Sequence, residues 1–418
     1  MDNNEEIIDE ESYLDPNETQ GEYIIDNKQQ NIPDDEDEDE DIEMGEGDEE
    51  MQDEEEEDDF VDESIQGFFE HTDAIYCTRA HKIRPELAIT GGGDDLAYLW
   101  NTITGDRIYQ LKGHSDSISS VEFNFNGTLV ATGGMDGVIK IWDVATGELK
   151  NTLEGPSESI EWMQWHPEGN FILAGSSDSC AFMWSTLKSN FVSSFIAHRG
   201  SVTCGGFTCD GKQVITASED GTMRIWNPKD ATTIFNFQNY GFHESLISCL
   251  SVQKNTNLVL TAGDDTFACL SNIKSGKVIN RLKGHTTSIS AVSFSNSNVN
   301  FCVTGGMDGS CKVWDIATQQ ERVSFKHKNT ITKILCHPVD PIVFTSSVDK
   351  TIQMWDERNG QLIKPLLGHQ DGILDFDLTI DNRIITASDD KVSLVFSLKP
   401  NPTTNSNNTT TTTTTTFN

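Results

Sequence analysis

Basic residues are scarce in this chain of 418 residues, where 29 Lys and Arg stand against 68 Asp and Glu and give a formal net charge of −39. Such an excess of negative charge repels nucleic-acid phosphates, so we expect no direct nucleic-acid partner. The chain also lacks an uninterrupted apolar stretch of about 18 residues, and its acidic start is unlike a secretory signal. We therefore expect no membrane insertion and a cytoplasmic location, with the nucleus left open.

Cysteine pairs of the Cys-x-x-Cys type are absent, and the nine cysteines form an odd set. Most of them lie inside short apolar runs, so they are interpreted as reduced, buried thiols. The histidines fall in separate repeats, which argues against a shared metal site. We expect neither a metal nor a cofactor.

Two terminal segments lack the composition of a folded core. Residues 1–62 contain two uninterrupted acidic runs, 34–41 and 53–59, and residues 399–418 include a run of Thr at 409–416. Neither segment can bury enough apolar surface to offset the entropy of ordering its chain. The sequence therefore predicts a disordered acidic tail over 1–62, a folded domain over 63–398 and a disordered Asn/Thr-rich tail over 399–418.

Short runs rich in Val, Ile, Phe and Thr fill the central region and are separated by Gly, Asn and Asp, which predicts an all-β domain. An anchor residue, usually Trp, recurs every 41–45 residues, and an Asp stands six residues before it in all eight copies. A Thr precedes that Asp by four residues and a His by 21–23 residues, except in the third copy, which lacks both. The period is that of a four-stranded propeller blade.

These repeats resemble the WD40 family through Gly-His at 113–114 and 284–285 and Trp-Asp at 142–143, 314–315 and 355–356. The resemblance implies a WD40 β-propeller in which Trp, Thr, His and Asp form a buried hydrogen-bonded chain within each blade. A buried carboxylate that accepts bonds from an imidazole and from turn amides avoids a large desolvation cost. The residues assigned to this scaffold are His71, Thr90, Asp94, Trp100, His114, Thr132, Asp136, Trp142, His198, Thr216, Asp220, Trp226, His285, Thr304, Asp308, Trp314, His327, Thr345, Asp349 and Trp355.

Repetition of the same Thr, His and Asp in successive blades favours a structural role over a catalytic relay. Lys333 and Asp375 fall at channel-facing positions, where an ion pair is a simpler interpretation than an active site. The sequence therefore predicts a protein that is not an enzyme.

The eighth repeat ends without an outer strand, because Phe396 is soon followed by Lys-Pro-Asn-Pro. Residues 64–70 precede the first repeat at the position of an outer strand, so we predict that they complete the last blade and close the ring. This predicts eight blades, with a seven-bladed ring and one irregular extra repeat as the alternative.

Side chains at two register positions line the narrower face of WD40 propellers, and the resemblance transfers those positions to this chain. They carry four acidic residues and no basic residue, which favours a basic partner. Trp162 lies at a position where other repeats carry small residues, and a core role in the third blade is as consistent with it as a contact role. The candidate partner-binding residues are Tyr76, Met135, Glu161, Trp162, Glu219, Asp264, Met307 and Asp389.

An acidic leader before about eight repeats resembles the angio-associated migratory cell protein family and its fungal relatives. The resemblance implies a chaperone for a basic large-subunit ribosomal protein, or a scaffold in cell migration and small-GTPase signalling. The acidic face favours a basic protein or peptide partner, such as a ribosomal protein, and we expect a monomer. The acidic tail is interpreted either as part of the client site or as an aid to solubility.

Overall fold

A computed structural model of the chain describes residues 61–187, 190–238 and 241–398. The described residues all belong to one compact unit. The acidic tail predicted for residues 1–62 lies outside the described residues except for residues 61 and 62, and the tail predicted for residues 399–418 lies outside them entirely.

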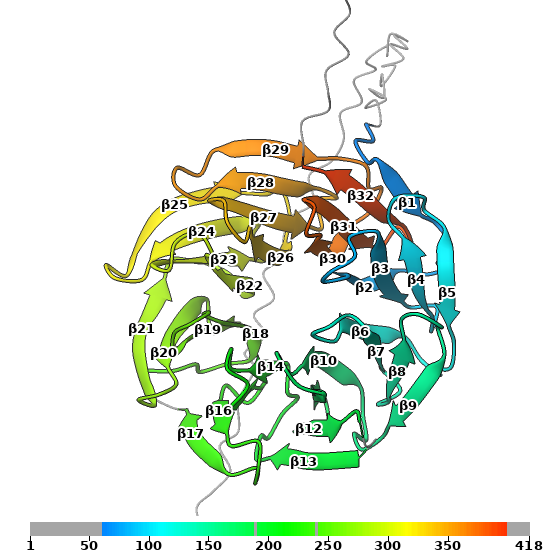
Figure 1. Cartoon of the computed structure of the whole chain (residues 1–418). Helices are drawn as coiled ribbons and strands as arrows, with labels where there is room; N and C mark the ends of the chain where they lie inside the picture. Colours follow the sequence, from blue (N-terminus) through cyan, green and yellow to red (C-terminus); the bar gives the residue numbers. More distant parts are fainter. Residues whose placement is uncertain (1–60, 188–189, 239–240, 399–418) are drawn as a thin grey trace, which may run out of the picture. The chain divides into compact units, whose positions relative to one another are not determined.

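Eight four-stranded antiparallel sheets make up the described chain, and no described residue is helical. Figure 1 shows the sheets as blades around a central axis, with the strands β2, β6, β10, β14, β18, β22, β26 and β30 nearest to it. The prediction of an all-β, eight-bladed propeller is confirmed, and the seven-bladed alternative is wrong.

The blades are numbered in chain order, and their strands are given from the innermost outward. Blades 1 to 4 consist of β2 (Ile75–Ala80), β3 (Leu87–Gly92), β4 (Ala97–Asn101) and β5 (Arg107–Leu111); β6 (Ile118–Phe123), β7 (Leu129–Gly134), β8 (Ile139–Asp143) and β9 (Leu149–Leu153); β10 (Ile160–Trp165), β11 (Phe171–Ser176), β12 (Cys180–Ser185) and β13 (Asn190–Ile196); β14 (Cys204–Phe207), β15 (Val214–Ala217), β16 (Met223–Trp226) and β17 (Thr233–Phe237).

Blades 5 to 8 follow the same order. They consist of β18 (Ile247–Val252), β19 (Leu258–Gly263), β20 (Phe267–Asn272) and β21 (Lys277–Lys283); β22 (Ile289–Phe294), β23 (Phe301–Gly306), β24 (Ser310–Asp315) and β25 (Gln320–Lys326); β26 (Ile331–Cys336), β27 (Ile342–Ser347), β28 (Ile352–Asp356) and β29 (Leu362–Leu366); β30 (Ile373–Leu378), β31 (Arg383–Ser388), β32 (Ser393–Ser397) and β1 (Gln66–Phe68).

The apolar core lies between neighbouring blades rather than inside any one of them. Every residue of β3 is buried, whereas β5 at the rim is exposed over its first two residues. One core cluster joins Ile89 and Leu99 of blade 1 to Val121 and Phe123 of blade 2. The middle strands are therefore apolar on both faces, because each face of the sheet packs on another blade.

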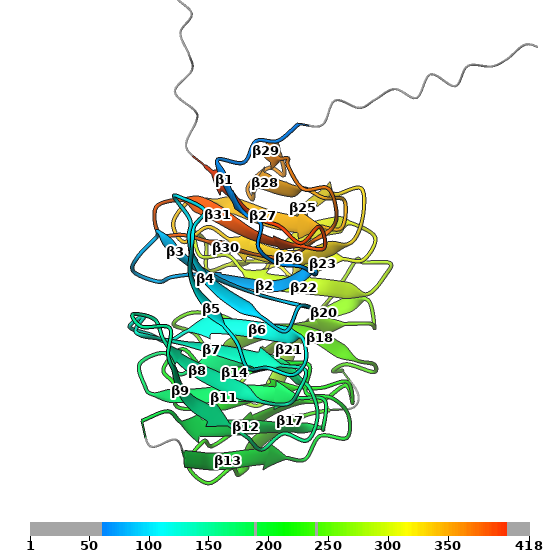
Figure 2. The same cartoon turned by 90° about the vertical axis from the view of Figure 1, so that its right-hand side faces the viewer.

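The two ends of the described chain meet in blade 8. Strand β1 pairs antiparallel with β32, with Phe68 opposite Ser393. Figure 1 shows β1 at the rim outside β32, and Figure 2 shows the blue strand beside the red end of the chain. Phe68 is buried and stacks on Trp100 of blade 1 at 5.2 Å between ring centroids. The predicted closure by an N-terminal strand is confirmed, and β1 covers the outer edge of β32, so blade 8 has four strands like the others.

A buried arginine also joins blade 8 to blade 1. The Arg383 guanidinium donates hydrogen bonds to the carbonyl and hydroxyl of Thr102, at 3.2 and 3.0 Å, and to the carbonyl of Pro85 at 3.0 Å. A guanidinium suits this position because its several donors can satisfy carbonyls that come from two loops.

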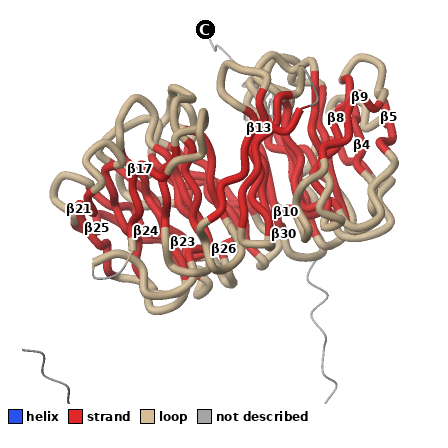
Figure 3. The backbone as a smooth tube through the Cα atoms, turned by 90° about the horizontal axis from the view of Figure 1, so that it is seen from below, coloured by secondary structure: helices blue, strands red, loops and turns tan. Residues whose placement is uncertain are grey.

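Loops cover both faces of the ring, at the two ends of the strands (Figure 3). We call one of them the top face. It carries the connections from each outer strand to the next blade and the turns between the second and third strands. The repeated histidines and aspartates lie in these two sets of loops.

Candidate partner-binding face

The hydrogen-bonded chain that supports the top face is complete in blade 2. Trp142 Nε1–H donates to Thr132 Oγ1 at 3.0 Å, Thr132 Oγ1 lies 2.8 Å from His114 Nε2, and His114 Nδ1 lies 3.1 Å from Asp136. Asp136 also accepts a bond from the Ser115 amide at 3.0 Å. A neutral imidazole that donates through Nδ1 and accepts through Nε2 satisfies every group in this chain.

The carboxylate in this chain stays ionised. Burial alone would raise the pKa of Asp136, but the Ser115 amide and the His114 ring hold it below its ordinary value. Burial lowers the pKa of His114, so the imidazole is neutral at pH 7.

Blades 4 and 7 repeat this arrangement with the same four residue types. Blades 5 and 8 keep the His–Thr and His–Asp contacts, although Ser271 and Phe396 replace the Trp.

Two of the predicted sets depart from the pattern. In blade 1 the buried Trp100 Nε1 has no hydrogen-bond partner among the described residues. In blade 6 His285 Nδ1 contacts Ser310 Oγ at 3.1 Å, and Ser310 in turn donates to Asp308 at 2.6 Å. The predicted direct contact between His285 and Asp308 is therefore replaced by a relay through a hydroxyl.

Blade 3 lacks the His and the Thr and holds its loops differently. Asp178 accepts bonds from the amide and hydroxyl of Ser157, at 2.8 and 3.3 Å. Trp184 Nε1–H donates to the carbonyl of Glu154 at 3.2 Å instead of to a Thr. The turn aspartate thus keeps its role as an acceptor in the third blade without an imidazole.

Small hydroxyl residues at the first top-face position fasten five of the blades to the next blade. Ser119 Oγ–H donates to the carbonyl of Ile160 at 2.5 Å, and Thr332 Oγ1–H donates to that of Ile373 at 2.6 Å. The same bond is made by Thr203, Ser248 and Ser290. In blades 1, 3 and 8 the position instead carries Tyr76, Glu161 and Leu374.

A constant backbone bond fixes the second top-face position, the residue before each turn aspartate. In every blade its amide donates to a carbonyl in the loop that leads into the inner strand, at 2.8–3.1 Å. The side chains project outward, with Met135 42% and Met307 52% exposed. Glu219, Asp264 and Asp389 are exposed as well.

Acidic side chains on this face destabilise one another's ionised form. Burial and then the carboxylate of Glu219 raise the pKa of Glu161. In blade 8, burial and then the carboxylates of Asp371 and Asp390 raise the pKa of Asp389. A cation placed between such carboxylates would lower their pKa values, so the face is electrostatically suited to a basic ligand.

Trp162 fills the seam between blades 3 and 4. Its indole N–H donates to the carbonyl of Val202 at 2.8 Å. A Cβ added at Gly175 or Gly205 would overlap the indole, so these two glycines make the space for it. The side chain is only half-buried, and it packs on the core cluster that includes Leu173. This placement favours the core role, and contact with a partner stays a prediction for the exposed edge. Tyr76, also half-buried, has its hydroxyl beside Gly93.

Basic side chains on the top face include Lys350 of blade 7, Lys391 of blade 8 and Arg199 of blade 4. Lys350 Nζ donates to the carbonyl of Gln370 at 2.8 Å, and Lys391 Nζ donates to that of Thr72 at 3.0 Å. Lys391 was missed at the sequence level, although it directly follows the turn aspartate, as Lys350 does. Glu161, Glu219 and Asp264 of blades 3 to 5, which we call the acidic sector, have Arg199 as a basic neighbour, while Asp389 lies near the lysines.

The channel contains a network of ion pairs that spans four blades. Asp375 contacts Lys333 of blade 7 at 2.6 Å and Arg79 of blade 1 at 2.7 Å, and Arg79 reaches Glu122 of blade 2 at 3.1 Å. Burial opposes ionisation of Asp375, but Lys333 and Arg79 hold its pKa below its ordinary value. The structure thus shows the ion pair anticipated for Lys333 and Asp375.

The described residues hold no cluster of three or more His, Cys, Asp or Glu side chains arranged for a metal ion. The same part of the chain has no helix with the length and apolarity needed to cross a bilayer.

Comparison with known proteins identifies the family. The WD domain, G-beta repeat, matches residues 105–143, 147–185, 189–227, 276–315 and 319–356. An uncharacterized WD repeat-containing protein of Schizosaccharomyces pombe is 41% identical over 347 residues, which cover 80% of this chain and 87% of that protein. The chain belongs to the WD40 repeat family. The unmatched repeats include blades 1, 5 and 8, in which the Trp–Thr bond is missing.

Two further likenesses bear on this WD40 propeller. The human angio-associated migratory cell protein is 32% identical over 353 residues, which cover 81% of each chain. Crystal structures of Saccharomyces cerevisiae Sqt1, and of Chaetomium thermophilum Sqt1 bound to the N-terminus of the ribosomal protein L10, have TM-scores of 0.76 and 0.74 at 23% identity. They cover 82% and 81% of this chain and all of the other chain, and at this identity they show the fold alone.

Proposed function

We propose that this WD40 propeller is a chaperone that holds a Lys/Arg-rich segment of a ribosomal protein on its top face. The observation that carries the proposal is the acidic sector, in which partial burial and the neighbouring carboxylate of Glu219 raise the pKa of Glu161. The net charge of −39 adds long-range attraction for a basic client. Ribosomal RNA would later take over the neutralisation of such a segment.

The apolar side chains next to the acids suit the same ligand. Met135 and Met307 are exposed and flexible, and they could cover the aliphatic stems of Lys and Arg. The N-terminus of ribosomal protein L10, which Sqt1 binds, is the first client to test.

The test reverses Glu161, Glu219, Asp264 and Asp389 to Lys together and measures binding of the L10 N-terminal segment by calorimetry at about 0.15 M salt. The matched control reverses Asp106, Glu148, Glu168 and Asp340, four exposed acids in the loops of the opposite face. The total charge is then the same in both variants. We expect the top-face variant to lose binding and the control to lose only part of its affinity, and equal affinities would refute the site.

A signalling adaptor is the second candidate, and the similarity to the angio-associated migratory cell protein supports it. An adaptor of that kind would bind a protein partner whose affinity changes little with salt, whereas a basic client should dissociate as salt rises. We further propose that the chain is a monomer that binds no nucleic acid and is not an enzyme, and that it resides in the cytoplasm, with the nucleus left open.

A further inference from the structure

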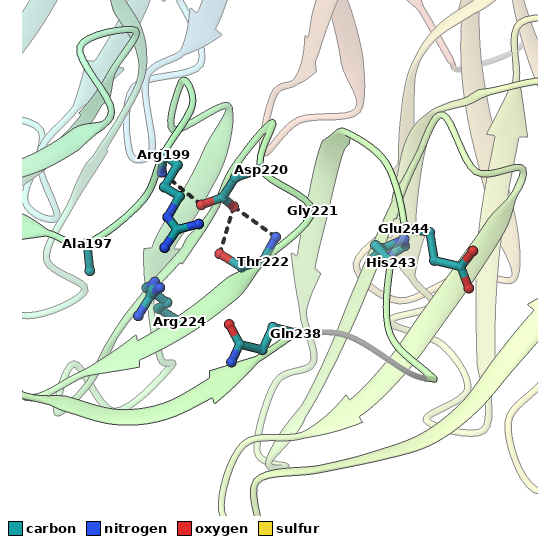
Figure 4. Close-up of a pocket in the computed structure, with 9 residues that line it drawn as sticks. All are labelled: Ala197, Arg199, Asp220, Gly221, Thr222, Arg224, Gln238, His243 and Glu244. Atoms are coloured by element: carbon teal, nitrogen blue, oxygen red, sulfur yellow. Dashed lines mark hydrogen bonds between the residues drawn. The ribbon is translucent and has the colours of Figure 1, made fainter. Parts of the chain in front are cut away.

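A pocket of about 480 Å³ lies between blades 4 and 5, and its lining includes Asp220, the residue that follows Glu219 of the acidic sector. Arg199, Arg224 and Gln238 line it on the side of blade 4, and His243 and Glu244 line it on the side of blade 5. Figure 4 shows the guanidinium of Arg199 directed toward Arg224, while the carboxylate of Glu244 points away from both arginines. Two cations thus share one wall of a cavity in a strongly acidic protein.

The Arg224 side chain is not satisfied by the described residues. Its Nε is buried and has no hydrogen-bond partner among them, and its guanidinium makes only a distant contact with the Trp226 ring, whose centroid lies 6.0 Å from Cζ. A buried donor without an acceptor costs free energy that a bound acceptor would recover.

Arg199 adds a second available cation. Its backbone amide donates to Asp220 at 2.9 Å, and no ion pair of its guanidinium is found in the described part of the chain. Burial lowers the pKa of Arg224, with Asp220 acting against this and Arg199 adding to it. The two guanidinium groups therefore repel each other, and an anion between them would remove that repulsion.

The nearby carboxylates are engaged elsewhere. Asp220 accepts bonds from the amide and hydroxyl of Thr222, at 2.9 and 2.7 Å, and lies against His198. Glu244 lies 3.7 Å from Arg281 of blade 5. Neither acid contacts the guanidinium of Arg199 or Arg224 within salt-bridge distance in the described structure.

We propose that this pocket is a phosphate-binding site, and that its ligand is a phosphorylated Ser or Thr side chain of a bound polypeptide. A phosphate monoester carries nearly two negative charges and three acceptor oxygens, which matches two guanidinium groups better than a single carboxylate does. The side-chain amide of Gln238 provides a further donor. This proposal does not rest on the proposed function, because it concerns a ligand of the opposite charge.

The first experiment measures thermal unfolding of the full chain in about 20 mM inorganic phosphate against chloride at equal ionic strength. We expect phosphate to raise the Tm by about 2 °C and this gain to vanish in Arg199→Gln and in Arg224→Gln. Arg358→Gln, an exposed arginine of blade 7, is the control and should keep the gain. Arg199 is exposed, so its variant remains informative even if Arg224→Gln fails to fold.

The proposed site would be refuted if phosphate and chloride gave the same Tm, or if phosphate raised the Tm of Arg199→Gln as much as that of the unchanged chain. The second experiment replaces inorganic phosphate with a Gly-Gly-phosphoserine-Gly-Gly peptide and its unphosphorylated form. Stabilisation by the phosphopeptide alone supports the proposed ligand. Stabilisation by inorganic phosphate without any by the phosphopeptide would overturn the peptide ligand and leave a free anion.

Discussion

Blades 2 and 3 are neighbours with the same four-strand topology, yet different interactions hold them in place. Blade 2 carries the full Trp142–Thr132–His114–Asp136 chain and is fastened to blade 3 by Ser119. Blade 3 lacks the His and the Thr, and the indole of Trp162 fills its seam with blade 4.

The difference shows how a propeller can expose an acidic side chain at this position without losing a blade. In blade 2 the top-face position is occupied by a hydroxyl that bonds to the next blade, so it is not available to a ligand. In blade 3 the same position is Glu161, which is exposed because Trp162 supplies the packing beside it. Loss of the regular pattern is therefore compatible with an intact four-stranded blade.

The largest effect should come from the seam of blade 3. Trp162→Ala removes the indole and its bond to Val202, and we expect a loss of about 3 kcal/mol in the free energy of unfolding. Ser120→Ala, the equivalent change in blade 2, should cost less than about 0.5 kcal/mol. Urea denaturation of both variants checks this, and equal losses would show that Trp162 is not a packing residue.

The next largest difference should separate the two turn aspartates. Asp136→Ala leaves the buried Nδ1–H of His114 without an acceptor and should cost about 2 kcal/mol. Asp178→Ala removes bonds from the exposed Ser157 and from the Cys180 amide but leaves no buried imidazole unpaired, so it should cost about 1 kcal/mol or less. Chemical denaturation of the two variants side by side measures how much the buried imidazole adds to the loss of stability. A larger loss in the free energy of unfolding for Asp178→Ala would contradict the expected order.

A smaller difference is expected at the first top-face position. Ser119→Ala removes a bond between blades and should cost about 1 kcal/mol. Glu161→Gln removes a carboxylate whose ionisation is disfavoured in the folded state, so we expect unchanged or slightly higher stability at pH 7. The same variant should weaken binding of the basic client segment, which separates a binding residue from a structural one.

The smallest effect is the pH dependence, which should have opposite signs in the two blades. The raised pKa of Glu161 means that its ionisation destabilises the fold above the ordinary Glu range, and acidification through the raised pKa relieves this. The lowered pKa of Asp136 means that its contribution is present above the ordinary Asp range and is lost as pH falls through the lowered pKa. Stability curves of Glu161→Gln and Asp136→Asn from pH 7 to 3 check both signs, and parallel curves would contradict them.

Register alone located the repeated residues, because each blade uses the same local geometry. The eight turn aspartates, the seven histidines and the strand at 66–68 could be placed from spacing and from the missing outer strand of the last repeat. The partners of Asp308 and Trp100 could not be predicted in this way. Ser310 stands between His285 and Asp308 in blade 6, and Phe68 stacks on Trp100 in blade 1.

The top-face residues were less predictable because their neighbours belong to other blades. Ser119, Thr203 and Thr332 share a register position with Glu161, and the sequence gives no sign that the hydroxyls bond to the next blade. A run of Ser and Thr at one register position is a signal that could have suggested such bonds. Arg224 carries no comparable signal, since its lack of a partner depends on what surrounds it.

The sequence by itself determined the eight-bladed ring, its closure and the buried scaffold, because period, turn chemistry and burial act over a few dozen residues within one repeat. Only the tertiary structure decided which side chains are free to meet a ligand. The partners of Ser119, Trp162 and Arg79 lie about 40 or more residues away in neighbouring blades. Whether a polar group is satisfied or available is settled where two blades meet, and no single repeat contains that information.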